Sequence, residues 1–218
     1  MDHSMMMGPT LWGLDISSLL MLVSGIFYVI CAIVVYRSYR TEKSELIGAL
    51  LAFLVYQSVS MFFMGVEMLS HNMFYGNIAG FAVILGSAYM LKFPLSKFSA
   101  GIRNSVFFVV LIAAFGVIAW FMQSIELQKQ LMTFVLWYDL VVNGVIAGGS
   151  IVVYGLKVRE NTLKAKALTG GTGVLSCCMV ANGFMLTGSM IIGSAVGFLA
   201  PLFILGSLKL GKKSAGNK

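Results

Sequence analysis

The chain has 218 residues, of which 59% are hydrophobic and only 11% are charged. So little charge would not keep a soluble domain of this size dispersed, so the composition predicts a protein whose solvent is the lipid bilayer. The formal net charge of +7 would suit a nucleic-acid partner, but the positions of the basic residues argue against nucleic acid.

The apolar residues form seven stretches, each close to the roughly 20 residues that cross a hydrocarbon core. We therefore expect an all-α membrane protein, a seven-transmembrane-helix bundle over residues 15–209. Gly188 and Ser189 are the expected corner between the last two helices, because glycine tolerates positive φ. The expected spans are 15–36, 46–69, 74–91, 105–123, 131–156, 167–188 and 190–209.

The basic residues fall almost entirely in alternate connections. Fourteen of the 15 follow the first, third, fifth or seventh stretch, and only Lys129 lies at the opposite end. The positive-inside rule then predicts a multi-pass protein of the cell membrane with an extracellular or periplasmic N-terminus and an internal C-terminus. Residues 1–14 would be an external tail containing Met and His, and residues 210–218 a basic cytoplasmic tail. The basic loops would contact anionic lipids.

The stretch 61–73, MFFMGVEMLSHNM, carries four methionines, a carboxylate and a histidine inside or beside a predicted span. At 100° per residue the polar and sulfur-containing residues of this helix share one face, and Val55, Val59, Phe62, Val66 and Leu69 occupy the other. Lipid cannot satisfy polar groups, so the first face should point at other helices or a cavity. That face consists of Gln57, Ser60, Met61, Met64, Glu67, Met68 and His71.

A second polar stripe is expected on the span 131–156, where Asp139, Asn143, Ser150 and Tyr154 lie near one meridian. Asp139 is the clearest intramembrane charge, and no basic residue is expected at its depth. An ionised carboxylate there is costly unless it is paired or hydrated. Asn182, in the sixth span, is expected at a similar depth.

Copper is the metal that these residues would suit, since thioether sulfur and imidazole are its preferred ligands. Met64 and Met68 are four residues apart, as are Glu67 and His71, and His3 lies in the same predicted external region. The alternative is that the methionines are ordinary core residues, which Met often is. Cys31, Cys177 and Cys178 are interpreted as small packing residues.

Short motifs here resemble parts of two membrane families. The start MDHSMMM, the Met64/Met68 pair and the Gly76/Gly80 pair resemble the high-affinity copper uptake transporters, in which external Met/His clusters collect copper and methionine rings line a pore. That family has three spans, so we assign no membership. The segment FYGNIAG (74–80) resembles the amide and urea channels, which have six spans.

Three functions remain open from the sequence. The first is binding or transport of a soft metal ion, copper, with Met64, Met68, His71, Glu67 and His3 as ligands. In this model Asp139, Asn143 and Asn182 form a deeper relay or filter. The second is an auxiliary subunit of a larger membrane complex, such as a respiratory one, or a homo-oligomer packed through glycine-rich faces. The third is a narrow channel for a small neutral solute or protons.

An enzyme is the less favoured reading, because the chain has no Walker, G-x-S-x-G or H-E-x-x-H motif. No cofactor is indicated other than copper. A retinal protein is excluded by the absence of a lysine within the last span, and a bis-histidine haem within one chain by the shortage of intramembrane histidines.

Overall fold

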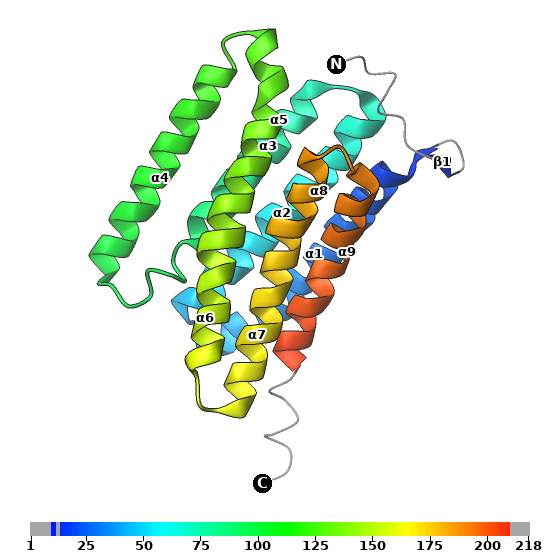
Figure 1. Ribbon diagram of the computed structural model, residues 1–218. Coiled ribbons are helices and arrows are strands. Elements are labelled where there is room, and N and C mark those ends of the chain that lie inside the picture. Colours follow the sequence, from blue (N-terminus) through cyan, green and yellow to red (C-terminus); the bar gives the residue numbers. More distant parts are fainter. Residues whose placement is uncertain (1–9, 12–13, 210–218) are drawn as a thin grey trace.

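The computed structural model describes residues 10–11 and 14–209, and these are almost entirely helical (Figure 1). Two two-residue strands, β1 (Thr10–Leu11) and β2 (Leu14–Asp15), pair antiparallel just before the first helix. The helices are α1 (Ile16–Glu42), α2 (Glu45–Ser70), α3 (Met73–Met90), α4 (Ala100–Phe121), α5 (Ile125–Asp139), η2 (Leu140–Gly148), α6 (Gly149–Lys157), α7 (Asn161–Leu175), η3 (Ser176–Ala181), α8 (Asn182–Leu186) and α9 (Met190–Lys209).

Helices α5, η2 and α6 are continuous and form one rod, and α7, η3 and α8 form another. Counted in this way, the described residues form seven rods that are long and apolar enough to cross a membrane. The expectation of an all-helical protein with seven potential spans is therefore confirmed. The side of the membrane on which each terminus lies stays a prediction. The tail residues His3 and Met5 to Met7 lie outside the described residues.

Local signals in the sequence explain where the helices begin and end. Asp15 caps α1 by accepting a hydrogen bond from the Ser18 amide at 2.9 Å. Lys43 and His71 end α1 and α2 in the left-handed conformation, with φ of 46° and 52°. Gly188 has φ of 83° in the turn before α9, as expected for the corner between the last two spans. The first span is longer than expected and carries Arg37 and Arg40 on its final turns.

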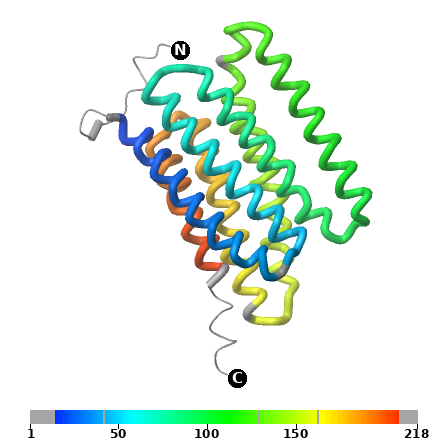
Figure 2. Tube along the Cα trace, turned by 180° about the vertical axis from the view of Figure 1, so that it is seen from behind, coloured from blue at the N-terminus to red at the C-terminus, as the bar shows by residue number. Residues whose placement is uncertain are grey.

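Six of the seven rods form a closed ring. Neighbouring contacts run from α1 to α2, α3, the α5–η2–α6 rod, the α7–η3–α8 rod and α9, and from α9 back to α1. The order answers a question that the sequence left open, because it brings polar residues of α2, α3, η2 and α8 toward one interior. Figures 1 and 2 show the rods packed side by side, with the start of α1 and the end of α9 at opposite ends of the bundle.

Helix α4 stands outside the ring at the edge of the molecule, where it packs mainly against α3 and α5 (Figures 1 and 2). Of its described side chains only Ala114, Ile118 and Phe121 are buried. Its base is fixed by charge, since Glu45 of α2 pairs with Lys92 at 3.2 Å and Arg103 at 2.6 Å. These pairs also show that the α1–α2 and α3–α4 connections lie at the same end of the bundle.

Candidate functional site

Asp139 is the centre of a buried polar cluster inside the ring. It lies near the middle of the rod Ile125–Lys157, and only 3% of its surface is exposed. The side-chain amide of Asn143 donates to Asp139 Oδ1 at 2.5 Å, and that of Asn182 donates to Asp139 Oδ2 at 2.5 Å. Both carboxylate oxygens therefore accept a hydrogen bond from a neutral group.

The cluster continues through sulfur toward α1 and α2. The Cys178 thiol lies beside the Asp139 carboxyl group and its neighbour Cys177 and interacts with both. Cys177 Sγ is 2.8 Å from the hydroxyl oxygen of Tyr28, and it accepts from the amide of Gln57 at 3.8 Å. This second group joins side chains from opposite sides of the ring.

In the other direction the cluster reaches α3. The Asn143 amide also donates to Ser87 Oγ at 2.8 Å, and the Ser87 hydroxyl donates to the Val83 carbonyl at 2.7 Å. The Asn143 side-chain oxygen has no partner among the described residues, although Asn143 is only 1% exposed. We call the connected set of Tyr28, Gln57, Ser87, Asp139, Asn143, Cys177, Cys178 and Asn182 the central polar network.

Two π-helical segments place these side chains. Asn143 lies within η2, Asp139 directly precedes it, and Asn182 directly follows η3. The two segments contact each other. A π-helical turn holds more residues than an α-turn, so it rotates the side chains that follow, and such turns are frequent at functional sites.

The π-helical turns also correct one expectation, the single stripe from Asp139 to Tyr154. Asp139 and Asn143 are buried, but Tyr154 is 51% exposed, and the Ser150 hydroxyl donates to the Ile146 carbonyl of its own rod. The single stripe assumes that each residue turns the helix by 100°, as in an α-helix. The nine-residue π-helical segment η2 turns by a smaller angle per residue.

The central polar network contains no cation. The partners of Asp139 are neutral, and the ion pairs found among the described side chains both belong to Glu45 at the end of the bundle. A buried charge without a counter-charge is unfavourable, whereas a protonated carboxyl group needs a hydrogen-bond acceptor for its O–H. Asn143 or Asn182 can supply that acceptor by turning its amide through 180°.

The polar face predicted for α2 does point into the bundle. Gln57, Ser60, Met61 and Met64 are buried, while Val55, Phe62 and Leu69 on the other face are exposed. Met64 belongs to the main apolar core and Met68 packs against it. Gln57 reaches the central polar network. This face of α2 therefore meets polar groups at Gln57 and apolar groups at Met64 and Met68.

Glu67 and His71 lie at the end of this face in different surroundings. The Glu67 carboxyl group lies against Gly76 of α3, so closely that a Cβ atom at Gly76 would overlap it. His71 is exposed, lies after the last residue of α2 and has left-handed backbone. His71 is the cap residue of α2, and its backbone amide donates to the Glu67 carbonyl at 2.7 Å, so the two residues lie one turn apart. Their role as a ligand pair stays a prediction.

The structure brings four of the predicted residues together and leaves the others apart. Asp139, Asn143, Asn182 and Gln57 join one network, whereas the Met64/Met68 pair packs in the core. No group of three or more His, Cys, Asp or Glu side chains in the described part of the chain is arranged to hold a metal ion. His3 lies outside that part.

Tyr28, Ser87, Cys177 and Cys178 belong to the network but were not singled out as functional. Tyr28 is fully buried in α1, where a tyrosine inside an otherwise apolar stretch was the available signal. Cys177 and Cys178 were interpreted as packing residues, and they are indeed buried and free. Their contacts with Tyr28 and Asp139 depend on the order of the helices.

No family model, curated protein or solved structure matches this chain.

Proposed function

We propose that the protein binds and releases protons at Asp139 and moves them through the bundle along the central polar network. The observation that carries this proposal is a carboxyl group with 3% exposure whose two oxygens accept from neutral amides and have no cation beside them among the described side chains. Such a group changes charge without breaking an ion pair. Ionisable residues inside membranes commonly serve as proton relays for this reason.

Proton binding forms an O–H bond on one carboxylate oxygen and removes the negative charge. The amide that donated to that oxygen turns, so that its own oxygen accepts the new O–H. If Asn143 turns, its oxygen faces Ser87, whose hydroxyl can rotate away from the Val83 carbonyl and donate to it. On release the electron pair of the O–H bond stays on the carboxylate and both amides donate again.

The network also offers routes beyond Asp139. Cys178 and Cys177 connect it to the hydroxyl of Tyr28, and Asn143 connects it to Ser87. Thiol and hydroxyl groups both donate and accept, so each can pass a proton to a neighbour. Hydrogen-bonded chains in a low-dielectric interior strengthen one another.

The test uses the full chain in liposomes that carry a potassium gradient and a pH-sensitive dye. Asp139→Asn keeps the size of the side chain and resembles the protonated acid, but it cannot release a proton. We expect proton flux to fall at least about a hundredfold in Asp139→Asn, the lower end of the effect typical of losing a proton-transfer group. Glu126→Gln, the same chemical change at an exposed position of the same rod, should leave the flux unchanged.

Infrared spectroscopy separates proton binding from transport. A titration of the parent should show the carbonyl band of a protonated carboxyl group, and Asp139→Asn should lack that band. If the flux and the band are the same in the parent and Asp139→Asn, Asp139 is a packing residue and the proposal is wrong.

Copper binding stays a second candidate, and one observation favours it. Met61, Met64 and Met185 lie in one buried cluster, and Met68, Met132 and Met190 pack against it, so thioethers from α2, α5, α8 and α9 gather in one core. Cu(I) is the metal that such sulfur groups select. Glu67 directly precedes Met68, and His71 follows the last residue of α2.

Leucine has nearly the same volume as methionine but no sulfur, so this substitution distinguishes a metal ligand from a packing residue. Met64→Leu/Met68→Leu should change the free energy of unfolding by less than about 1.5 kcal/mol. If copper binds there, the metal content after purification in mild detergent should fall sharply, while Phe62→Leu on the opposite face should retain it. Equal copper content in the double variant and the parent would leave the methionines as core residues.

A further inference from the structure

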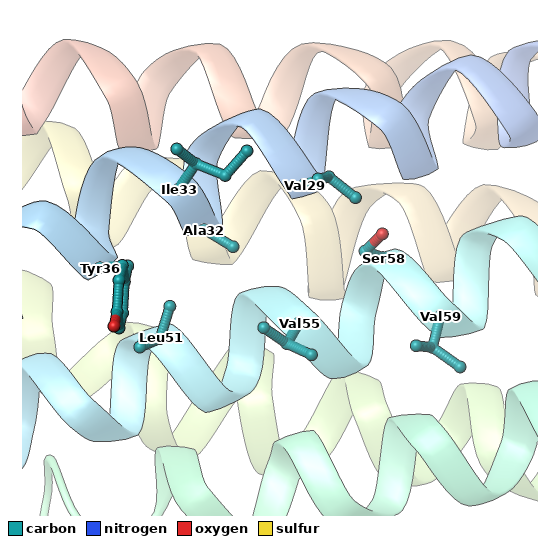
Figure 3. Close-up of a pocket in the computed structure, with 8 residues that line it drawn as sticks. All are labelled: Val29, Ala32, Ile33, Tyr36, Leu51, Val55, Ser58 and Val59. Carbon is teal, nitrogen blue, oxygen red and sulfur yellow. The ribbon is translucent and has the colours of Figure 1, made fainter.

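An apolar groove runs along the outer surface of the bundle between α1 and α2. It has a volume of about 440 Å³ and is lined by Val29, Ala32, Ile33, Tyr36, Leu51, Val55, Ser58 and Val59. Figure 3 shows these side chains around the space between the two helices, with Tyr36 and Leu51 at one end and Val59 at the other.

The groove exists because small residues alternate with large ones. Ala32 and Ser58 are 7% and 8% exposed and form its floor. Val29, Ile33 and Val55 are 46%, 50% and 45% exposed and form its rims. The Ser58 hydroxyl donates to the Gly25 carbonyl at 2.9 Å, so the floor offers no unpaired polar group. The groove therefore suits a hydrocarbon chain.

A second, basic pocket of about 610 Å³ adjoins the groove at the end of α1. It is lined by Tyr36, Tyr39, Arg40 and Lys43, and Tyr36 lines both the groove and the pocket. Tyr36 and Arg40 are four residues apart on α1, which puts their side chains on one helix face, and Lys43 is the cap residue that follows the helix.

The backbone and a glycine hold this pocket in shape. The Lys43 amide donates to the Tyr39 carbonyl at 2.8 Å in the left-handed cap of α1. The Tyr39 ring lies over Gly48 of α2, where a Cβ atom would be 3.1 Å from it. Arg40 and Lys43 have no ion-pair partner among the described side chains, because Glu45 pairs with Lys92 and Arg103 instead.

We propose that the groove and the basic pocket together bind one anionic phospholipid of the adjacent membrane leaflet. The phosphate lies between Arg40 and Lys43, the two tyrosines lie at the level of the glycerol, and one acyl chain occupies the groove. The charge of the pocket and its continuity with the groove through Tyr36 select this occupant. An apolar helix of a partner would fill the groove but leave both basic side chains without an anion.

The dimensions agree with a lipid standing in one leaflet. The groove follows α1 from Val29 to Tyr36, roughly 10 Å by helix rise, and half of a hydrocarbon core measures about 15 Å. Arg40 and Lys43 lie one and two turns beyond Tyr36, toward the membrane surface. Tyrosine is common at this level because its ring is apolar and its hydroxyl polar.

The first test is native mass spectrometry of the full chain in mild detergent, with phosphatidylglycerol or phosphatidylcholine of identical acyl chains. The parent should retain one phosphatidylglycerol and bind phosphatidylcholine more weakly. Arg40→Gln/Lys43→Asn should weaken phosphatidylglycerol binding about 30-fold, because a basic residue near the surface contributes about fivefold. Asparagine is chosen at position 43 because it tolerates left-handed backbone.

Arg37→Gln is the matched control, since Arg37 lies on the same end of α1 but does not line the pocket. It should leave phosphatidylglycerol binding unchanged. An equal loss in Arg37→Gln and in the double variant would mean general surface charge and would overturn the proposal, as would unchanged binding in the double variant.

A second pair of variants tests the acyl chain. Val55→Phe fills the groove, and Val145→Phe makes the same change at a similarly exposed position elsewhere, the two valines being 45% and 50% exposed. Only Val55→Phe should reduce phosphatidylglycerol binding, and glycerol phosphate, which lacks acyl chains, should not displace the lipid from the parent. Equal binding in the two valine variants, or displacement by glycerol phosphate, would show that the groove holds no chain.

Discussion

Asp139 shows how one side chain organises its surroundings when water is absent. Asp139 is the only buried acidic residue among those that the structure describes, and asparagines from two rods turn their amides toward it. Carboxamides are suited to this position because each offers both a donor and an acceptor. They can therefore support the charged and the neutral form of the same carboxyl group.

This geometry predicts different stabilities for two substitutions of Asp139. Asp139→Ala takes an acceptor from two buried amides, of which Asn143 keeps its bond to Ser87, and unpaired donors cost about 1–3 kcal/mol each in proteins. Bonds between membrane helices average nearer 0.6 kcal/mol, because the unfolded state in a membrane also finds partners. We expect a loss of about 1–3 kcal/mol for Asp139→Ala and less than about 1 kcal/mol for Asp139→Asn.

The measurement is the free energy of unfolding in mixed micelles, with Glu126→Ala as an exposed carboxyl control. If Asp139→Ala is no less stable than Asp139→Asn, the two amides do not depend on the carboxyl group, contrary to the geometry described above.

At the scale of the helix, close approach of the two π-helical rods is set by a glycine. A Cβ atom at Gly144 would lie 2.4 Å from Met179 Cγ and 3.2 Å from the Met179 backbone nitrogen. Gly149, five residues later on the same rod, has no neighbouring atom within 4 Å of such a Cβ. Both glycines lie in the same apolar rod, but Gly144 is packed against η3 and Gly149 has open space beside it.

Alanine at these two glycines should therefore have opposite effects. Gly144→Ala should lower the free energy of unfolding by about 1–3 kcal/mol, because the backbone of η3 must move away. Gly149→Ala should be neutral or raise it by up to about 1 kcal/mol, since alanine is the better helix former. Chemical denaturation of both variants in the same detergent makes the comparison, and equal effects would mean that η2 and η3 do not pack as closely as described.

At the scale of the whole molecule, six rods close a ring and one stays outside. The ring encloses the central polar network, and α4 is attached through α3, α5 and the Glu45 ion pairs. Exposed ion pairs contribute at most about 1 kcal/mol, so they set the position of α4 more than its stability. The exposed apolar side chains of α4 include Ile102, Phe108, Val109, Ile112 and Trp120.

The alternation of seven rods predicts which connections lie on the same side of the membrane. Single cysteines at Ser44, Ser99 and Thr162 should react with a membrane-impermeant maleimide only from the internal side, and cysteines at Asn72 and Gln128 only from the external side. Background labelling should be low, because Cys31, Cys177 and Cys178 are buried. Labelling of position 162 from the outside would contradict both the seven-span arrangement and the positive-inside orientation.

By itself, the sequence was sufficient for the number of long helices, most of their bounds and the inward face of α2. These features depend on hydropathy and on the 3.6-residue period, which are properties of neighbouring residues along one helix. It also marked Asp139, Asn143, Asn182 and Gln57, because polar groups inside an apolar stretch need a partner. The turn at Gly188 followed from the same local reasoning.

Only the tertiary structure decided which of these residues meet. The π-helical turns moved Tyr154 away from Asp139, and the order of the helices brought Tyr28 and Cys177 together across the ring. The packing of α2 against α3 placed the Glu67 carboxyl group on Gly76. The groove between α1 and α2 likewise depends on how two helix faces fit. Hydropathy predicts that a helix lies in the membrane, but it does not predict which helices are its neighbours. An apolar face packs about equally well against lipid and against another apolar helix.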